Sequence, residues 1–294
     1  MRLLFDLIQA LRPRQWTKNL LVFAGLLFAQ KATDPTAVIE AVEAFLVFCV
    51  LAGSMYLIND SLDVAQDRLD PIKCQRPLAA GRITVTVAVA TAIVLTILGL
   101  AGAYLASGTL LLKVCLAYVG ITLLYSGFLK HIVIIDVFAV ASGFVLRAVA
   151  GATAVHAVIS PWLIICTLLL ALFLALAKRR GELMTHGDQA SHHRASLAEY
   201  SLELLDQMIS VMTASTLMSY ALYTISDRTV ELIGSTNMIY TVPFVIYGIF
   251  RYLYLVHGKE QGGSPTKALL NDTPIMINIG LWFTTVAAIL YLVR

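Results

Sequence analysis

The chain contains 294 residues, of which 59% are hydrophobic and only 13% are charged. A soluble domain carries about twice that charged fraction, so the composition excludes an ordinary water-soluble globular protein. The apolar runs are nearly continuous and do not alternate with polar residues, which excludes a transmembrane β-barrel and predicts membrane-spanning α-helices. The formal net charge is only +3, and we predict no nucleic-acid partner.

Taken in chain order, the elements begin with a segment that mixes charged and apolar side chains. Residues 1–14 are predicted to form an amphipathic helix that lies on the membrane surface. Nine apolar runs follow, each near the roughly 17–25 residues that cross a bilayer. These predicted spans cover residues 15–30, 41–58, 84–106, 110–128, 132–155, 161–177, 205–225, 238–256 and 275–293. We therefore expect an all-α, polytopic membrane protein whose single integral-membrane domain occupies residues 1–294.

The distribution of basic residues predicts the orientation of the spans. If the N-terminus is cytoplasmic, 16 of the 21 Lys and Arg residues fall in cytoplasmic segments, in agreement with the positive-inside rule. Nine spans then place the C-terminus outside. Two long charged loops, residues 59–82 and 178–204, share the cytoplasmic side. We expect these loops to form the active site of a multi-pass protein of the cell (inner) membrane.

An acidic motif begins where the second predicted span ends. Asn59, Asp63 and Asp67 are spaced four residues apart, so on a helix they share one face, each about 6 Å from the next. Carboxylates this close repel one another unless a cation lies among them. Mg²⁺ prefers oxygen ligands and is commonly shared between one or two carboxylates and substrate phosphates. We therefore predict that these catalytic residues bind Mg²⁺ and a diphosphate; a solvated extension of the helix is the alternative.

Basic residues near this motif are suited to bind phosphate oxygens. Lys73 and Arg76 follow the motif in the same loop. The lysine ammonium can bind phosphate as a point charge, and the planar arginine guanidinium can bind two phosphate oxygens. In the later loop Lys178 and Glu182 share a helical face, and Arg179 lies beside them. The excess of positive charge there favours direct phosphate binding over a second magnesium site. For both groups the alternative is a basic cluster that only marks the cytoplasmic side.

Further polar side chains lie near the same predicted membrane boundary. Tyr125 and Lys130 lead through a short loop to Asp136, near the cytoplasmic start of the fifth span. Arg147 lies about 16 Å further along that helix, inside the bilayer, where a charged side chain is costly and needs either a structural partner or the acceptor lipid. The predicted substrate-binding residues are Lys18, Tyr56, Asp60, Lys73, Arg76, Tyr125, Lys130, Asp136, Lys178, Arg179 and Glu182.

The Asn-x-x-x-Asp-x-x-x-Asp motif after the second of nine spans resembles that of the UbiA superfamily of membrane prenyltransferases. Within the superfamily the chain looks most like the decaprenyl-phosphate phosphoribosyltransferases. The resemblance covers essentially the whole chain, and its segments are 12–19 (RPRQWTKN), 56–81, 125–137, 143–151 (GFVLRAVAG) and 177–182 (AKRRGE). Most superfamily members have a second aspartate motif in the later loop. This chain has Lys178, Arg179 and Glu182 there instead, which agrees with the phosphoribosyl branch.

The resemblance implies a UbiA-like helical bundle and a particular reaction. In that reaction 5-phosphoribosyl 1-diphosphate donates its phosphoribosyl group to a decaprenyl-like polyprenyl phosphate, as in cell-wall precursor synthesis, and diphosphate is released. The resemblance also implies that Asn59, Asp63 and Asp67 hold Mg²⁺ and the leaving diphosphate. The expected partners are the two substrates and membrane lipid, and a homo-oligomer is compatible with the sequence.

Two other functions remain open at this point. A UbiA-type aromatic prenyltransferase would keep the fold and use a polyprenyl diphosphate donor with an acceptor such as 4-hydroxybenzoate, but it needs the second acidic motif. A transporter of lipids or anions would place its charges near the bilayer midplane, whereas most charges here gather at the predicted cytoplasmic rim. The leading hypothesis is therefore a magnesium-dependent membrane pentosyltransferase.

Overall fold

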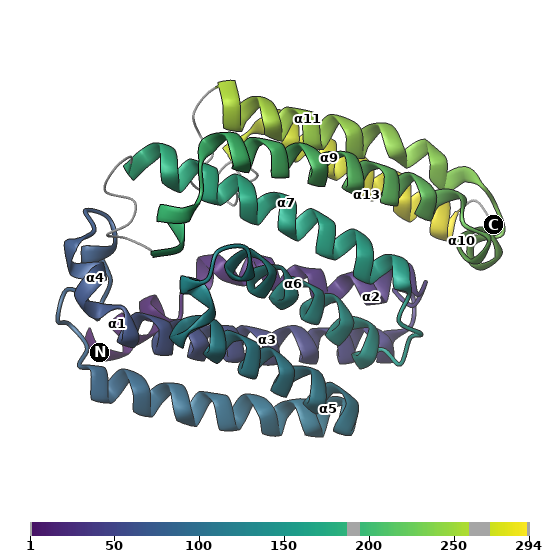
Figure 1. Ribbon diagram of the computed structural model, residues 1–294. Helices are drawn as coiled ribbons and strands as arrows, with labels where there is room; N and C mark the ends of the chain where they lie inside the picture. Colours follow the sequence, from purple (N-terminus) through teal and green to yellow (C-terminus); the bar gives the residue numbers. More distant parts are fainter. Residues whose placement is uncertain (1, 187–194, 259–270, 293–294) are drawn as a thin grey trace. The chain divides into compact units, whose positions relative to one another are not determined.

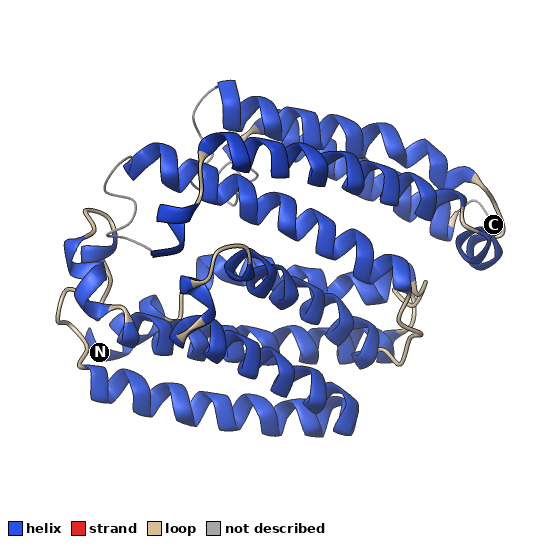
Figure 2. Cartoon of the chain, in the orientation of Figure 1, coloured by secondary structure: helices blue, strands red, loops and turns tan. Residues whose placement is uncertain are grey.

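The computed structural model describes residues 2–186, 195–258 and 271–292. The chain divides into two compact units, Met1–Ile159 and Ser160–Arg294. Within the described ranges every regular element is a helix, and the connections between them are loops (Figure 2). The predicted all-α fold class is confirmed for this part of the chain.

The first unit is built around the long helix α3, which begins at a well-formed cap. The Asp34 side chain accepts a 2.9 Å hydrogen bond from the Thr36 N–H, and Pro35 occupies the first turn, where its missing N–H is harmless. Apolar side chains of α3, α5 and α6 then form a shared core. The elements are α1 (Arg2–Ala10), η1 (Pro13–Val22), α2 (Phe23–Phe28), α3 (Pro35–Leu62), α4 (Val64–Leu69), η2 (Lys73–Gln75), α5 (Val85–Gly127), η3 (Leu129–His131) and α6 (Ile135–Ala154) (Figure 1).

Helix α5 consists of two helical segments joined at a kink, and these correspond to the predicted spans 84–106 and 110–128. The kink lies at Ser107 and Gly108, where Gly108 has φ 71° and ψ −155°, a conformation that only glycine adopts readily. Before the kink, Gly99 packs against Leu51 of α3. After it, the Tyr118 ring lies 5.1 Å from that of Phe48, so the chain has turned back along the same helix. At 1.5 Å per residue, a straight helix of this length would be about twice as long as a bilayer core is thick.

The predicted first span, residues 15–30, forms two short pieces instead of one long helix. A 3₁₀ helix, η1, leads into the six-residue helix α2. This segment packs directly on the backbone of α6, because a Cβ atom at Gly151 would lie 1.7 Å from the Val22 carbonyl oxygen. A Cβ at Gly25 would likewise lie 2.3 Å from the Ala152 nitrogen. The two glycines thus allow the close approach of η1 and α2 to α6.

The N-terminal helix is shorter than the predicted helix 1–14. Helix α1 ends at Ala10, and Arg12 has a positive φ of 54°, which starts η1 in a new direction. The apolar residues Leu3, Leu4, Phe5 and Ile8 are exposed on α1. Asp6, on its opposite side, is buried in an ion pair with Arg82 at 2.8 Å. Exposed apolar side chains suit a helix lying in the membrane interface, which stays a prediction.

The second unit is held together partly by polar contacts between its apolar helices. The Trp282 indole N–H donates to the Tyr220 hydroxyl at 2.9 Å, and that hydroxyl lies 2.7 Å from the hydroxyl of Thr241. Asn278 donates to the Phe244 carbonyl at 2.9 Å. The elements are α7 (Pro161–His186), η5 (Ala195–Glu199), α9 (Leu202–Ile225), α10 (Asp227–Ile233), η6 (Asn237–Thr241), α11 (Val242–Gly258) and α13 (Thr273–Tyr291).

Seven helices of the described chain are long and apolar enough to cross a membrane. They lie at 35–62, 85–127, 135–154, 161–185, 202–225, 237–257 and 273–291. Counting α5 as two segments gives eight of the nine predicted spans, and residues 15–30 are not among them. The count of nine, the cytoplasmic N-terminus and the outer C-terminus therefore stay predictions.

Candidate active site

The acidic motif lies at a break between two helices. Helix α3 ends at Leu62 and α4 begins at Val64, with Asp63 between them at φ −99° and ψ 7°. The motif therefore continues across two helices, and not along the single helix on which its spacing was interpreted. Backbone hydrogen bonds from the Asp63 N–H to the Asn59 carbonyl (3.0 Å) and from the Asp67 N–H to the Asp63 carbonyl (2.8 Å) still keep the three residues one turn apart.

Asp63 lies between an amide and a cation. The Asn59 side-chain amide donates to Asp63 Oδ2 at 3.0 Å, and the Lys130 ammonium forms an ion pair with Oδ1. Lys130 comes from η3, which follows α5, and its side chain is buried. The structure thus brings together three of the predicted site residues from segments far apart in the sequence.

A second group of charges surrounds Asp60, which is 1% exposed. Arg76 Nη1 lies 2.5 Å from Asp67 Oδ2 and 3.2 Å from Asp60 Oδ1, so one guanidinium joins the two acids. The Arg12 guanidinium pairs with the same Asp60 oxygen and stacks over the Tyr56 ring at 4.8 Å. Asp60 Oδ2 is buried and accepts no hydrogen bond from a described residue. The predicted residues Tyr56, Asp60 and Arg76 therefore form one cluster with Asp67.

The pKa values of Asp67 and Asp70 are shifted in opposite directions. Burial raises the pKa of Asp67, and the guanidinium of Arg76 opposes that effect only in part. Burial also acts to raise the pKa of Asp70, but hydrogen bonds from the backbone N–H groups of Lys73 (2.8 Å) and Ile72 (2.9 Å) outweigh it. The Lys73 ammonium, 3.4 Å from Asp70 Oδ2, adds to them, so the pKa of Asp70 lies below its usual value.

The acids offer oxygen ligands but not a closed metal cage. Among the described residues, no three His, Cys, Asp or Glu side chains converge as a metal-binding group. Mg²⁺ usually keeps several waters and binds through one or two carboxylates plus substrate phosphates, so a closed cage is not needed. Asp63 and Asp67 lie one turn apart, and Asp60 has a buried oxygen that accepts no hydrogen bond from the described chain. This donor set fits Mg²⁺ shared with a phosphate ligand, and the metal roles of Asn59, Asp63 and Asp67 stay predictions.

Arg147 has structural partners in the first unit. Its guanidinium donates to Asn19 Oδ1 at 2.7 Å, to the Gly143 carbonyl at 2.7 Å and to the Tyr118 hydroxyl at 3.0 Å. All these partners are neutral, and the residue is 6% exposed. The sequence left two alternatives for Arg147, a structural partner within the protein or the acceptor lipid. The structure shows partners within the protein. Lys18 lies on η1, one residue before Asn19.

The other predicted residues of this unit lie at helix ends. Asp136 is fully buried in the first turn of α6, and Tyr125 lies in the last turns of α5. Both make contacts within the described chain. Tyr125 precedes η3, which carries Lys130, and Asp136 follows it. The three residues therefore lie around one short connection between α5 and α6, as the sequence predicts.

The predicted cationic cluster of the second unit lies at the end of α7. Arg179 Nη1 lies 2.7 Å from Glu182 Oε2, and Lys178 Nζ lies 3.4 Å from Glu182 Oε1. Two cations thus share one carboxylate, and the group carries net positive charge. Arg179 is 2% exposed, whereas the Lys178 side chain is 47% exposed and better placed to meet a ligand. That this cluster faces the acids of the first unit stays a prediction.

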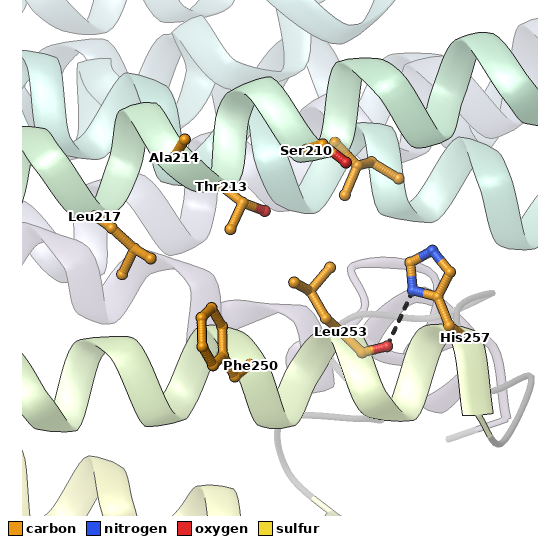
Figure 3. Close-up of a pocket in the computed structure, with 8 residues that line it drawn as sticks. Ser210, Thr213, Ala214, Leu217, Phe250, Leu253 and His257 are labelled. Atoms are coloured by element: carbon orange, nitrogen blue, oxygen red, sulfur yellow. Dashed lines mark hydrogen bonds between the residues drawn. The ribbon is translucent and has the colours of Figure 1, made fainter.

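The second unit also contains a polar group that no sequence pattern predicts. Arg180 lies 2.6 Å from Asp206 of α9, and His257 Nε2 lies 3.2 Å from the same carboxylate oxygen. His257 also contacts the Leu253 carbonyl at 3.1 Å (Figure 3). These residues come from three helices, so no local motif predicts them.

Beside this group, a cavity of about 400 Å³ separates α9 from α11 (Figure 3). Its walls are largely apolar, and His257 is its one titratable lining residue within the described chain. Such walls do not suit a diphosphate, and the predicted site residues lie elsewhere. The lining residues are Ile209, Ser210, Thr213, Ala214, Leu217, Phe250, Leu253 and His257.

The long apolar helices and the charged cluster at the end of α3 define an all-helical integral membrane protein. The chain belongs to the UbiA prenyltransferase family, whose sequence model matches residues 19–271 and so extends across both units. The predicted superfamily is therefore confirmed.

Two named relatives are similar to the chain over nearly its whole length. The chain is 34% identical to the decaprenyl-phosphate phosphoribosyltransferase of Corynebacterium glutamicum, covering 97% of this chain and 87% of that protein. It is 33% identical to the protein of the same name from Mycolicibacterium smegmatis, covering 98% and 93%. The predicted likeness to this branch of the family is also confirmed.

Solved structures show the same fold. A UbiA homologue from Archaeoglobus fulgidus, bound to GPP and Mg²⁺, superposes with a TM-score of 0.76 at 22% identity. The match covers 97% of this chain and 99% of that one. A UbiA homologue from Aeropyrum pernix superposes with a TM-score of 0.65 at 17% identity, covering 93% and 98%. At these identities the likeness extends to the fold alone.

Proposed function

We propose that the chain transfers the phosphoribosyl group of 5-phosphoribosyl 1-diphosphate to a decaprenyl-like polyprenyl phosphate and releases diphosphate. The observation that carries the proposal is the paired cluster in which Lys130 contacts Asp63 while Arg76 joins Asp60 to Asp67. Such a cluster supplies both metal-type oxygens and phosphate-binding cations. The names of the relatives support this donor and acceptor.

In the proposed reaction, the bond between the anomeric carbon and the diphosphate oxygen breaks, and its electron pair leaves with the diphosphate. An oxygen of the lipid phosphate forms the new bond to the same carbon. The acceptor is already an anion, so no side chain has to remove a proton or form a covalent intermediate. The protein acts by positioning the two substrates and by stabilising charge on the leaving group.

The residues have separate tasks in this scheme. Asn59, Asp63 and Asp67 would hold Mg²⁺, which when bound neutralises charge on the leaving diphosphate. Lys130 and Arg76, which form ion pairs with Asp63 and Asp67, would also bind phosphate oxygens. In the second unit, Lys178, whose side chain is half-exposed, would bind a substrate phosphate. Lys18, on η1, would bind the lipid phosphate.

We also propose that the site faces the cytoplasm, with the N-terminus on that side and the C-terminus outside. The excess of basic residues in the loops 59–82 and 178–204 supports this orientation. A cytoplasmic site would have direct access to a water-soluble sugar diphosphate, while the lipid acceptor would enter from the bilayer. Cysteine-accessibility labelling of single-cysteine variants in each loop would test the orientation.

The function is tested by offering each class of donor to the purified protein. Labelled 5-phosphoribosyl 1-diphosphate, Mg²⁺ and polyprenyl phosphates of several lengths should give a labelled lipid and free diphosphate. A parallel reaction contains polyprenyl diphosphate and 4-hydroxybenzoate. Label appearing only in a prenylated aromatic product would overturn the proposal in favour of the aromatic prenyltransferase. Movement of lipid or anions without diphosphate release would overturn it in favour of a transporter.

A further inference from the structure

The cavity between α9 and α11 has a buried floor and an exposed rim (Figure 3). Ile209 and Thr213 form the floor, where they are 1% and 9% exposed. Ser210, Ala214 and Phe250 lie at the rim and are exposed. Both helices are long and apolar enough to cross a membrane, so a hydrocarbon chain can enter the cavity from the bilayer.

The Thr213 hydroxyl lines this cavity and has no hydrogen-bond partner in the described chain. A threonine in a helix often donates to the carbonyl four residues earlier, as Thr216 does to Met212 at 2.7 Å. In Figure 3 the Thr213 side chain points instead into the space between α9 and α11. A buried hydroxyl without a partner is costly. A ligand with a polar atom at this depth would supply the partner, whereas a pure hydrocarbon chain would not.

A charged cluster lies at the end of the cavity that carries His257. The His257 Nδ1 lies 3.1 Å from the Leu253 carbonyl, and its Nε2 lies 3.2 Å from Asp206 Oδ1. Both partners are acceptors, so the ring donates to both only when it is doubly protonated. Arg180 Nε donates to the same carboxylate at 2.6 Å, while its Nη1 lies 3.5 Å from the sulfur of Met184, a weak acceptor. Two cations thus share one carboxylate, which leaves an excess of positive charge for an anionic group.

The order of polar groups along α9 is that of a glycerophospholipid. Thr213 follows Asp206 by seven residues, about 10 Å along the helix, and its side chain leans back toward the charged cluster. A diacyl glycerophospholipid carries a phosphate, then ester carbonyls a few bonds deeper, and then hydrocarbon. In a polyprenyl phosphate, hydrocarbon follows the phosphate directly, so it offers no acceptor to the Thr213 hydroxyl.

We infer that this cavity binds one anionic diacyl glycerophospholipid, such as phosphatidylglycerol. An ester carbonyl accepts a hydrogen bond from the Thr213 hydroxyl, and the phosphate lies at the end that carries His257 and Arg180. Part of one acyl chain packs against apolar walls that include Leu217 and Phe250. The volume of about 400 Å³ holds a segment of such a chain and not the whole lipid. A lipid bound to the folded chain would stabilise the second unit, and this inference does not depend on the proposed transfer reaction.

The test titrates phosphatidylglycerol into the purified, delipidated full chain and counts bound lipids by native mass spectrometry. Three other lipids are compared with it. The dialkyl ether analogue of phosphatidylglycerol lacks the ester carbonyls. Phosphatidylcholine has these carbonyls but no net charge. A polyprenyl phosphate has a charged phosphate but no ester, and it is added in competition with bound phosphatidylglycerol.

Two variants of α9 change the cavity, and each has a matched control. Thr213→Val removes the hydroxyl and keeps the shape of the side chain. Its control is Thr216→Val, because Thr216 is also buried on α9 but lies outside the lining of the cavity. Ala214→Trp fills the cavity. Its control is Val211→Trp, at an exposed position of the same helix outside the lining.

We expect wild type to bind phosphatidylglycerol about fivefold or more tightly than the ether analogue or phosphatidylcholine, in line with one lost hydrogen bond or charge contact. Thr213→Val should bind the ester and ether lipids equally. Ala214→Trp should bind phosphatidylglycerol about tenfold more weakly, and both controls should bind it like wild type. Phosphatidylglycerol should also raise the midpoint of thermal unfolding of wild type but not that of Ala214→Trp.

Four outcomes would overturn the inference. Wild type could bind the ester and ether lipids equally, or Thr213→Val could keep the full preference for the ester. Equal binding of phosphatidylglycerol and phosphatidylcholine would remove the anionic headgroup. Displacement of bound phosphatidylglycerol by an equal concentration of polyprenyl phosphate would assign the cavity to a prenyl lipid instead. If Ala214→Trp does not fold, the comparison of ester and ether lipids in Thr213→Val still decides.

Discussion

Lys130 forms an ion pair with Asp63, although 67 residues separate them in the sequence. The pair joins the break after α3 to the short η3 segment that follows α5. Because Asn59 binds the other oxygen of the same carboxylate, Asp63 is held in a fixed orientation at the predicted membrane boundary. The positioning of Asp63 by groups from two distant segments is the feature that the proposed chemistry uses most directly.

The first prediction concerns Lys130. Lys130→Met should lower kcat by about 10- to 100-fold, since a charge-assisted hydrogen bond contributes roughly 1.5–3 kcal/mol. Lys130→Arg should retain most activity because it keeps the cation. Initial rates at saturating substrates, together with thermal unfolding in detergent, separate a lost contact from a misfolded protein. A normal rate for Lys130→Met would remove this residue from the site.

The second prediction concerns the proposed metal ligands. Asp63→Ala and Asp67→Ala should abolish turnover, while the protein still inserts and unfolds at a similar temperature. Asp227→Ala is the matched control, because Asp227 is an exposed acid on α10 of the second unit. It should keep full activity. Near-normal turnover in either Asp63→Ala or Asp67→Ala would refute the metal assignment.

The third prediction uses the depressed pKa of Asp70. A carboxylate whose folded pKa lies below its unfolded value stabilises the protein above the unfolded pKa, near 4, and loses this effect as pH falls through the folded pKa. Asp70→Asn should therefore unfold at a lower temperature than wild type at pH 7. The difference should shrink as the pH is lowered below about 4. A constant difference across this pH range would contradict the shift.

The fourth prediction concerns the buried Arg147. Arg147→Met removes the side-chain donor that binds the Asn19 oxygen, the Gly143 carbonyl and the Tyr118 hydroxyl. The cost should be about 2–4 kcal/mol, measured as a lower midpoint of thermal unfolding. Arg228→Met, at an exposed position on α10, is the control. Equal midpoints for the two variants would show that the Arg147 network adds little to stability.

The fifth prediction concerns Lys178. Lys178→Ala should raise the KM for one phosphate-bearing substrate by about tenfold, with a smaller effect on kcat, because it removes one phosphate-binding charge. Lys113→Ala changes an exposed lysine of α5 and serves as the comparison. An unchanged KM for both substrates would place Lys178 outside the site.

Most of the fold could be predicted from the sequence because long apolar runs have few alternatives in a bilayer. Even the division of α5 was visible, since Ser107 and Gly108 separate two apolar runs. The 3₁₀ conformation of η1 was not visible, because it depends on the contact of Val22 with Gly151 of a distant helix. The break at Asp63 was also missed, since the residue spacing is compatible with a continuous helix.

The residues of the candidate site could be predicted from the sequence, but only some of the contacts between them could. The spacing of Asn59, Asp63 and Asp67 identified the acids, and nearby cations followed from charge. The pairing of Arg12 with Asp60 was not predicted, because it needs the turn at Arg12, where φ is 54°. Nor was the bridge from Arg76 to Asp67, since side-chain ion pairs between loops leave no periodic signal.

The central claim is that the acids of the first unit hold a diphosphate through Mg²⁺. The most direct measurement is equilibrium binding of labelled inorganic diphosphate to the purified protein, with and without Mg²⁺, for wild type and Asp67→Asn. We predict tight binding that requires Mg²⁺ in wild type and is lost in Asp67→Asn. Equal binding without the metal, or equal binding by the variant, would contradict the claim.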